Sequence, residues 1–544
     1  MKLASALLTS LILFFAPKHI LAQTLEEVLS YGLPVVVVNT VNEEEPTAEL
    51  ISTPPEGCIG YGITNVTKVP GRVRIFLPGD TENPAYDSGE YVKGESGMTI
   101  KIRGNSSALA TAKRPYKIKL QKKADMLLRG CSDKYKDKDW ALLKAQPTKA
   151  AKFACPIFSK IGNVVTEVLK VTEWVPDSRY VNLLFNGNFR GYYQLTETIK
   201  RNEMCRINVD KHTGYISEID PYYWNEDVYV ESSFLTDTSS PFQFTFKYPD
   251  SDDIIEEQLA DFKAFIDLFD ASIVSGCYPQ LIDVESCARW LLAHQILGTL
   301  DGAGSNVYII RRNDHSMLTM GPLWDFDSIF RVQGRWTNII SLHYFKYMLQ
   351  KSPNKLLARE MIRIWNTEKE HVLAEVQHYH DSLVGTDYAE AIDKSTEANA
   401  KKWGSKQMDK IDVSAENLAA WLSTRAHEID SLLNTLNTVD GDFSYDPLLD
   451  CIMSPRAHGL SRARKVVRDG HLYIIKDNET YSIDGKRIKQ GLCLREEHQS
   501  FQDSLRGLIE ETNHYRAVTV VTVITVYFEV WLYFHFPLYY YIIN

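Results

Sequence analysis

The first half of the chain contains short segments in which apolar and polar side chains alternate, a pattern that predicts β-strands. In the segment RPYKIKL, one face of the expected strand carries Tyr116, Ile118 and Leu120. The other face carries Lys117 and Lys119, so this strand is expected to be apolar on one side only. Strands of this kind, or continuous apolar runs of similar length, are expected at 33–40, 73–77, 98–104, 114–120, 139–145, 180–187, 190–197, 214–220 and 242–249.

A tight turn and one helix interrupt this β-rich region. Asn186 and Gly187 stand between two of the expected strands, and an Asn-Gly pair favours a two-residue hairpin turn because both residues accept a positive φ. Between 148 and 169 the spacing of apolar residues changes to that of a helix. The front of the chain is therefore predicted to be mostly β-sheet.

The hydrophobic period becomes helical for most of the chain between residues 254 and 436. Ser286 is expected to be the N-cap of one of these helices. Together the two halves predict an α+β protein with a β-rich N-terminal lobe, a helix-rich C-terminal lobe and a ligand-binding cleft between them. The elements expected in this half are helices at 254–270 and 286–297, strands at 306–312 and 318–324, and mostly helix from 344 to 436.

The N-terminus has the features of a secretory signal peptide. Lys2 provides a positive charge, residues 3–15 are apolar, and small residues end at Ala22. The apolar run is short for a membrane span, which favours cleavage after Ala22 over an uncleaved anchor. Residues 1–22 are thus interpreted as a signal peptide, and the mature chain is expected in the periplasm, at the cell surface or outside the cell.

The C-terminal part is expected to be separate from the main domain. Residues 438–455 have the composition of a linker, and 456–490 contain short alternating strands separated by turn residues. This small β module resembles the C-terminal sorting tails of Bacteroidetes-type bacteria, which would imply association with the outer membrane. Within the tail at 491–544, the apolar segment 517–543 is long enough to span a bilayer. It has three interpretations: a membrane anchor, a buried or aggregation-prone β segment, or read-through sequence without a selected role.

Composition narrows the class of protein. The chain has 544 residues, of which 44% are hydrophobic and 24% charged, as in globular proteins of more than one domain. Its formal net charge of −10 gives no support to nucleic-acid binding. The eight cysteines form no CxxC pair, so buried free thiols with one or two disulfides are expected rather than a zinc site.

The segment GPLWDFDSIF places two carboxylates in the most apolar turn of the chain. Asp325 and Asp327 flank Phe326, and an unpaired charge in such surroundings is costly. A metal ion is one partner that would remove this cost, although alone the two could also be ordinary turn residues. Upstream, Asp301 and Asn306 lie five positions apart after an expected helix. Protein kinases have this order of catalytic-loop Asp, Asn and Asp-Phe-Gly turn, but Asp327 stands here in place of the glycine.

A set of ordered motifs resembles the spore-coat CotH kinase family, which has an atypical protein-kinase-like fold. The resemblance covers residues 30–437, and its single motifs are weak whereas their order is specific. The motifs, in chain order, are RGNSS (103–107), KRPYKIKL (113–120), DWALLKA (139–145), NGNFRGYYQLTE (186–197), the 301–306 loop and GPLWDFD (321–327).

The resemblance implies a kinase that transfers the γ-phosphate of ATP to Ser/Thr hydroxyls of a protein substrate. It assigns Asp301 as the catalytic Asp and implies Mg²⁺ or Mn²⁺ as the metal. Like the family, the chain has no GxGxxG loop. The residues it implies for the site are Asn306, Asp325 and Asp327 as metal ligands, and Lys117, Lys119, Arg103 and Glu197 at the nucleotide, with Lys117 favoured over Lys119.

Two other classes of function use the same features. One is a catalytically idle, kinase-like protein for surface binding or assembly, which the scarcity of extracellular ATP favours. The other is a different metal-dependent transferase on the same scaffold, since fold alone does not fix chemistry. The sequence identifies neither the acceptor protein nor the oligomeric state.

Overall fold

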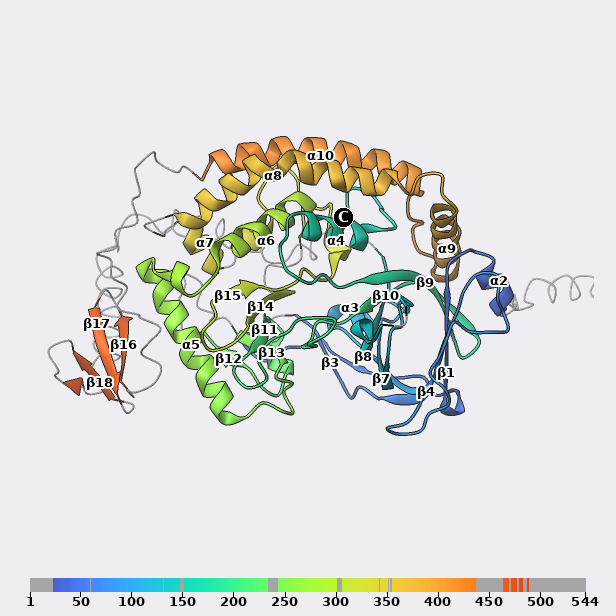
Figure 1. Ribbon diagram of the computed structural model, residues 1–544, viewed down its shortest axis with the longest axis horizontal. Coiled ribbons are helices and arrows are strands. Elements are labelled where there is room, and N and C mark those ends of the chain that lie inside the picture. The colour runs from blue at the N-terminus through green and yellow to red at the C-terminus, as the bar shows by residue number, and fades with distance from the viewer. Residues whose placement is uncertain are drawn as a thin grey trace, which may run out of the picture. The chain divides into compact units, whose positions relative to one another are not determined.

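The computed structural model has two compact units, Met1–Cys451 and Ile452–Asn544, and each is described by itself (Figure 1). The predicted signal peptide, the linker at 438–455 and the apolar segment 517–543 lie outside the described residues. The structure describes residues 23–58, 60–130, 132–146, 151–232, 243–300, 306–341, 343–350, 352, 355–436, 463–468, 471–476, 479–482 and 487–488.

An eight-stranded sheet forms the front of the first unit, with strand order β1-β9-β10-β8-β7-β6-β4-β5. Because β1 also pairs with β4, the sheet closes into a ring that contains every strand except β5. The bounds are β1 (Val35–Thr40), β4 (Val69–Phe76), β5 (Tyr86–Asp87), β6 (Met98–Ile102), β7 (Tyr116–Ala124), β8 (Asp137–Leu143), β9 (Ser178–Phe185) and β10 (Asn188–Glu197).

Alternation along these strands decides which side chains fill the ring. Ile118 of β7, Trp140 of β8 and Tyr193 of β10 belong to one buried apolar cluster inside it. Their neighbours, such as Lys117 and Thr196, therefore lie on the outer face of the closed sheet. The predicted Asn-Gly turn between β9 and β10 is confirmed, with φ of 47° at Asn186 and 71° at Gly187.

A second sheet and a set of helices complete this unit, so the protein is α+β, as expected. The second sheet has the order β12-β13-β11-β14-β15, and a separate hairpin pairs β2 (Glu49–Ile51) with β3 (Gly62–Thr64). Its strands are β11 (Tyr215–Ile219), β12 (Val230–Glu231), β13 (Gln243–Tyr248), β14 (Val307–Arg311) and β15 (Leu318–Met320).

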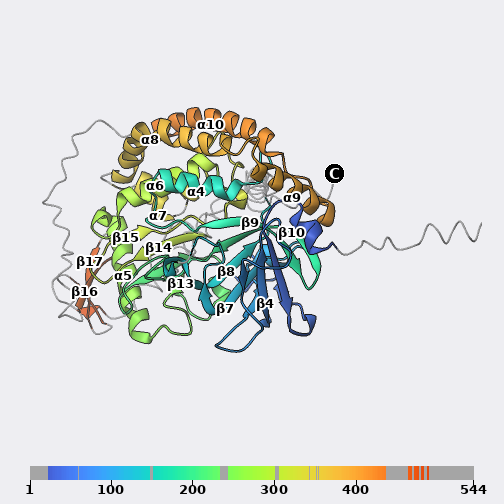
Figure 2. The same cartoon turned by 45° about the vertical axis from the view of Figure 1, so that its right-hand side comes forward.

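Four helices gather on one side of the sheets. Figures 1 and 2 both show α8 and α10 side by side, next to α4 and α6. Trp421 of α10 donates its indole N–H to the carbonyl of Ile296 in α6 at 3.1 Å, which ties these layers together. The helices are α2 (Leu25–Leu29), α3 (Ser106–Leu109), α4 (Phe158–Val168), α5 (Glu256–Ser275), α6 (Val284–Leu297), α7 (His343–Gln350), α8 (Leu356–Asp381), α9 (Asp387–Trp403) and α10 (Ile411–Asn434).

Two helix boundaries differ from the prediction. The helix expected from 148 begins only at Phe158, since Pro156 disfavours helical geometry in the residue before it and the N–H of Lys152 bonds to the carbonyl of Phe330. The N-cap of α6 is Asp283 rather than Ser286. The carboxylate of Asp283 accepts the Ser286 N–H at 3.0 Å, and the hydroxyl of Ser286 instead accepts the N–H of Met320 at 2.9 Å.

The second unit contains a four-stranded antiparallel sheet within the range expected for the small β module. Among the described helices, none combines the length and apolar character needed to cross a bilayer. Cys277 is disulfide-bonded, whereas Cys58, Cys155, Cys205 and Cys287 are free thiols. The strands of the second unit are β16 (Ala463–Arg468), β17 (His471–Lys476), β18 (Glu479–Ser482) and β19 (Arg487–Ile488).

Candidate active site

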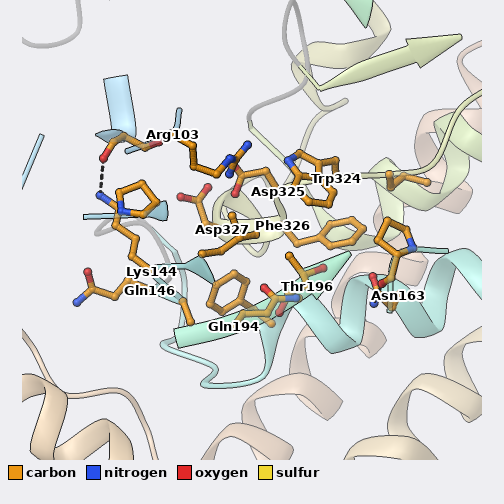
Figure 3. Close-up of a pocket in the computed structure, with 18 residues that line it drawn as sticks. Arg103, Lys144, Gln146, Asn163, Gln194, Thr196, Trp324, Asp325, Phe326 and Asp327 are labelled. Carbon is orange, nitrogen blue, oxygen red and sulfur yellow. Dashed lines mark hydrogen bonds between the residues drawn. The ribbon is translucent and has the colours of Figure 1, made fainter. Parts of the chain in front are cut away.

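A pocket opens between the outer face of the closed sheet, α4 and the turn that follows β15 (Figure 3). The pocket is small, with a cavity volume of about 50 Å³, and it opens to solvent. Its walls come from parts of the chain that are far apart in sequence, so only folding brings them together. The charged and amide side chains of the lining are Arg103, Lys144, Gln146, Asn163, Gln194, Asp325 and Asp327.

The acidic turn is anchored by Phe326, which is buried against α4. A Cβ atom added to Gly162 of α4 would lie only 2.4 Å from the Phe326 ring, so the ring occupies the space that glycine leaves. Asp325 adopts left-handed backbone geometry, with φ 57° and ψ 68°, which is unusual for a residue other than glycine. Strained backbone of this kind collects at functional sites. The turn thus holds Asp325 and Asp327 in the pocket on either side of a buried ring.

Two cations approach these carboxylates. The guanidinium of Arg103 lies over the Trp324 ring, 5.6 Å from its centre. The ammonium of Lys144 donates to the carbonyl of Ser107 at 3.0 Å. Burial lowers the pKa of Lys144, while Asp327 and Asp325 act in the opposite direction, which places all three groups in one electrostatic neighbourhood. Figure 3 shows the two carboxylates between Arg103 and Lys144 in this view.

The backbone of Lys144 is fixed by a second lysine. Lys113 is 1% exposed, and its ammonium donates to the carbonyl of Lys144 and to the side-chain oxygen of Asn399 in α9, both at 2.8 Å. A third bond goes to the carbonyl of Tyr192. Burial lowers the pKa of Lys113 well below its ordinary value. Lys113 therefore joins the pocket lysine to β10 and α9 through uncharged oxygen atoms.

Lys144 is the lysine that lines this pocket, whereas Lys117 and Lys119, which the family resemblance assigned to the nucleotide, are not among its lining residues. Lys117 stands directly opposite Ala141, and Ala141 opposite the pocket residue Thr196. Neighbouring strands are about 4.8 Å apart, so Lys117 lies roughly 10 Å from Thr196, the residue of this row that lines the pocket. It pairs with Asp139 at 3.3 Å instead. Arg103, by contrast, lies in the pocket as expected.

Glu197 also lies outside the pocket. It is 1% exposed, and its carboxylate accepts bonds from Arg129 and from the N–H of Asp177, both at 3.0 Å. Gln194 and Thr196 line the pocket from the same strand because alternate residues share one face. These two residues and Asn163 of α4 were not found from the sequence, since polar residues on a strand and a helix carry no distinctive spacing.

Asp301 lies outside the described residues, and Asn306 immediately precedes β14. The backbone of Asn306 is left-handed, with φ 61°, and its N–H donates to Glu218 of β11 at 3.0 Å. Tyr308 connects this region with the acidic turn. Burial raises the pKa of its phenol, and Glu218 and Asp325 add to that rise. Glu218 and Asp325 thus both influence the charge state of Tyr308, whereas Asn306 is not part of the pocket lining.

The residues present suit a metal ion that is held partly by a substrate. In the described part of the chain there is no group of three or more His, Cys, Asp or Glu side chains that could hold a metal by themselves. Mg²⁺ typically takes one or two carboxylates and completes its octahedron with phosphate oxygens and water. Asp325 and Asp327, beside two cations that can hold phosphate, fit that requirement and not that of an all-protein cage.

Comparison with known proteins identifies the family. The family model described as CotH kinase protein matches residues 100–429, more than half of the chain. No curated protein matches. Among solved structures, HipA of the Shewanella oneidensis MR-1 toxin–antitoxin system, in complex with HipB and operator DNA, is 13% identical over 74% of each chain, with a TM-score of 0.22. That score is too low to support a structural argument, so the assignment depends on the family model. This chain belongs to the CotH kinase protein family.

Proposed function

We propose that this protein is an exported phosphotransferase that moves the γ-phosphate of ATP to Ser/Thr hydroxyls of a protein substrate, with Mg²⁺ or Mn²⁺. The observation that carries the proposal is the meeting of Asp325 and Asp327 with Arg103 and Lys144 in one pocket. A triphosphate bound to a divalent cation needs both signs of charge at close range. Family membership supports a kinase-like activity. The closed sheet and the helical region would correspond to the two lobes of a kinase-like layout.

Each charged group has a distinct part in this reaction. Arg103 and Lys144 hold phosphate oxygens, and Asp325 with Asp327 holds the metal, with Asn306 as a further ligand. When bound, the metal neutralises phosphate charge that would otherwise repel the incoming oxygen. The acceptor hydroxyl forms a new O–P bond, the bond between the γ-phosphorus and the β-phosphate oxygen breaks, and ADP leaves. The family pattern gives the hydroxyl proton to Asp301.

Export and attachment at the cell surface belong to the same proposal. The signal-like N-terminus and the sorting-tail resemblance of 456–490 support export with an outer-membrane association. The disulfide at Cys277 supports an oxidising compartment, since such bonds are uncommon in the cytoplasm.

Labelled ATP tests the reaction. Purified protein with Mg²⁺ or Mn²⁺ and a Ser/Thr-rich acceptor is incubated with ATP labelled at the γ- or the α-phosphate. Label from the γ-phosphate on the acceptor is the expected result, and Lys144→Met is expected to abolish it. Lys394→Met is the matched control, because Lys394 pairs with Glu390 on the exposed side of α9. Transfer of the α-phosphate would replace the proposal by nucleotidyl transfer, and absence of nucleotide binding would favour an idle binding protein.

A further inference from the structure

The backbone at Asn306 is fixed by a contact outside the acidic turn. Its φ of 61° lies in the left-handed region, which Asn adopts more readily than most residues other than glycine. The direction of its side chain depends on that backbone geometry. A metal ligand in this conformation needs a group that holds its main chain in place.

Glu218 is the group that holds it. Glu218 is 7% exposed and sits on β11, directly opposite Tyr308 of β14. One carboxylate oxygen accepts the Asn306 N–H at 3.0 Å, and the other pairs with the ammonium of Lys247 on β13, also at 3.0 Å. The two oxygens of one carboxylate thus connect the start of β14 to a half-buried cation two strands away.

Lys247 places a positive charge directly beside this carboxylate. Asp220 lies near Glu218, and two buried carboxylates in proximity favour protonation of one of them. Although burial acts to lower it, Glu218 and other carboxylates raise the pKa of Lys247 above its ordinary value. An ionised carboxylate accepts a stronger hydrogen bond from a backbone N–H than a neutral acid does.

We propose that Glu218 and Lys247 form a positioning pair that holds the Asn306 backbone in its left-handed conformation and so fixes the position of a side chain that the proposed function assigns to the metal. That Asn306 binds a metal rests on the proposed function. That Glu218 holds the Asn306 backbone rests on the hydrogen bond alone. Both residues bring charge into largely buried strands, where charge is costly unless it is used. Neither residue lines the pocket, so the pair is inferred to act through Asn306.

The test is a double-mutant cycle between Glu218 and Asn306. Binding of Mn²⁺ in the presence of ADP is measured by electron paramagnetic resonance for the parent, Glu218→Ala, Asn306→Ala and the double variant. Loss of an outer-shell partner typically weakens metal binding by about 10- to 100-fold, so Glu218→Ala is expected to weaken it at least tenfold. In the Asn306→Ala background, Glu218→Ala is expected to change it by less than about twofold. An equal loss in both backgrounds would overturn the positioning role.

A second variant separates positioning from folding. Glu218→Met with Lys247→Met replaces the whole pair by apolar side chains, a change that buried ion pairs often tolerate. This variant is expected to keep its melting temperature within a few degrees and to lose Mn²⁺ affinity as Glu218→Ala does. A lowered melting temperature with parental Mn²⁺ affinity would make the pair merely structural and overturn the proposal.

Hydrogen exchange distinguishes this inference from the proposed function. If the parent protein does not bind Mn²⁺ with ADP, the phosphotransferase proposal fails. Whether Glu218 holds the Asn306 backbone is then tested by the hydrogen-exchange rate of backbone amides in a peptide that contains residues 306–312. An exchange rate at least tenfold faster in Glu218→Ala supports this role, and an unchanged rate contradicts it.

Discussion

The two sheets of the first unit place the same kind of side chain in opposite electrostatic surroundings. On the outer face of the closed sheet, Asp139 lies among lysines. Burial alone would raise its pKa, but Lys117 and Lys200 lower the pKa of Asp139 to about 2. On the second sheet, burial and the neighbouring Glu218 raise the pKa of Asp220 to about 6. One region therefore favours negative charge and the other disfavours it.

One lysine of each region shows the same contrast. Lys113, near the closed sheet, is held by neutral oxygens, and burial lowers its pKa. Lys247, on the second sheet, is held by Glu218, and its pKa is raised although desolvation opposes the rise. The pocket lining itself carries both signs of charge, on Arg103, Lys144, Asp325 and Asp327. This combination suits a ligand that carries both signs, such as a triphosphate with its metal ion.

The largest effect is expected when the pocket itself loses a charge. Asp325→Asn keeps the shape of the turn but removes one of the two carboxylates from the pocket. Losing a preorganised charge at a reacting centre typically costs about 100- to 1,000-fold in kcat, and a fall of at least 100-fold in phosphate transfer is expected. Steady-state kinetics with γ-labelled ATP measures it, with the melting temperature as a control for folding. A variant that retains a tenth of the parental rate would contradict the assignment of Asp325.

The next effect compares these two lysines through stability. Lys247→Met leaves the Glu218 carboxylate buried without its ion-pair partner and is expected to cost about 3–5 kcal/mol in the free energy of unfolding. Lys113→Met leaves only neutral acceptors unsatisfied, which predicts a smaller loss of about 1–3 kcal/mol. Urea denaturation measures both. Equal losses would show that the charge of the partner does not set the difference.

Overpacking at the acidic turn should have an intermediate effect. In most helices a Gly→Ala change stabilises by about 1 kcal/mol. Gly162→Ala should instead destabilise by about 1–3 kcal/mol, because the new methyl group would collide with the Phe326 ring. Thermal unfolding measures the sign, and the transfer assay reports whether the displaced ring also moves Asp325. A stabilised variant would mean that the ring can shift without cost.

The smallest effect is the opposite pH dependence of the two aspartates. The folded pKa of Asp139 is below its unfolded value, so its contribution, roughly 2 kcal/mol, is present above pH 4 and is lost as the pH falls towards 2. The folded pKa of Asp220 is above its unfolded value, so stability decreases as the pH rises from about 4 to 6. Denaturation curves of Asp139→Asn and Asp220→Asn across pH 2–7 should lose these slopes separately. Unchanged slopes would contradict the assigned surroundings.

Local sequence signals predicted most of the strands because alternation is a property of neighbouring residues. In β7, the apolar Tyr116 and Ile118 face the interior and Lys117 faces outwards, as the period of two requires. The same reasoning failed at the start of α4, where Pro156 and a bond from Lys152 to Phe330 displace the helix. A contact with a residue far along the chain competes there with local preference, and the local pattern contains no trace of it.

The sequence allowed the acidic residues of the candidate site to be selected, but it did not predict which other side chains would lie beside them. Asp325 and Asp327 could be selected because carboxylates in an apolar turn demand a partner. Glu218 and Lys247 are likewise charged residues within segments expected to be strands, but the sequence does not show that their side chains meet. Lys144 could not be preferred over Lys117, because the choice depends on Lys113 and on strand register.

By itself, the sequence determined the alternation of the strands, the Asn-Gly turn, the α+β class and the acidic turn, since these depend on residues close together along the chain. Tertiary structure alone decided the closure of the sheet through β1 and β4, the selection of Lys144 as the pocket lysine and the pairing of Glu218 with Lys247. These features join segments about 30 to 40 residues apart along the chain. Their energies come from burial and from charges at distances that only the folded chain defines.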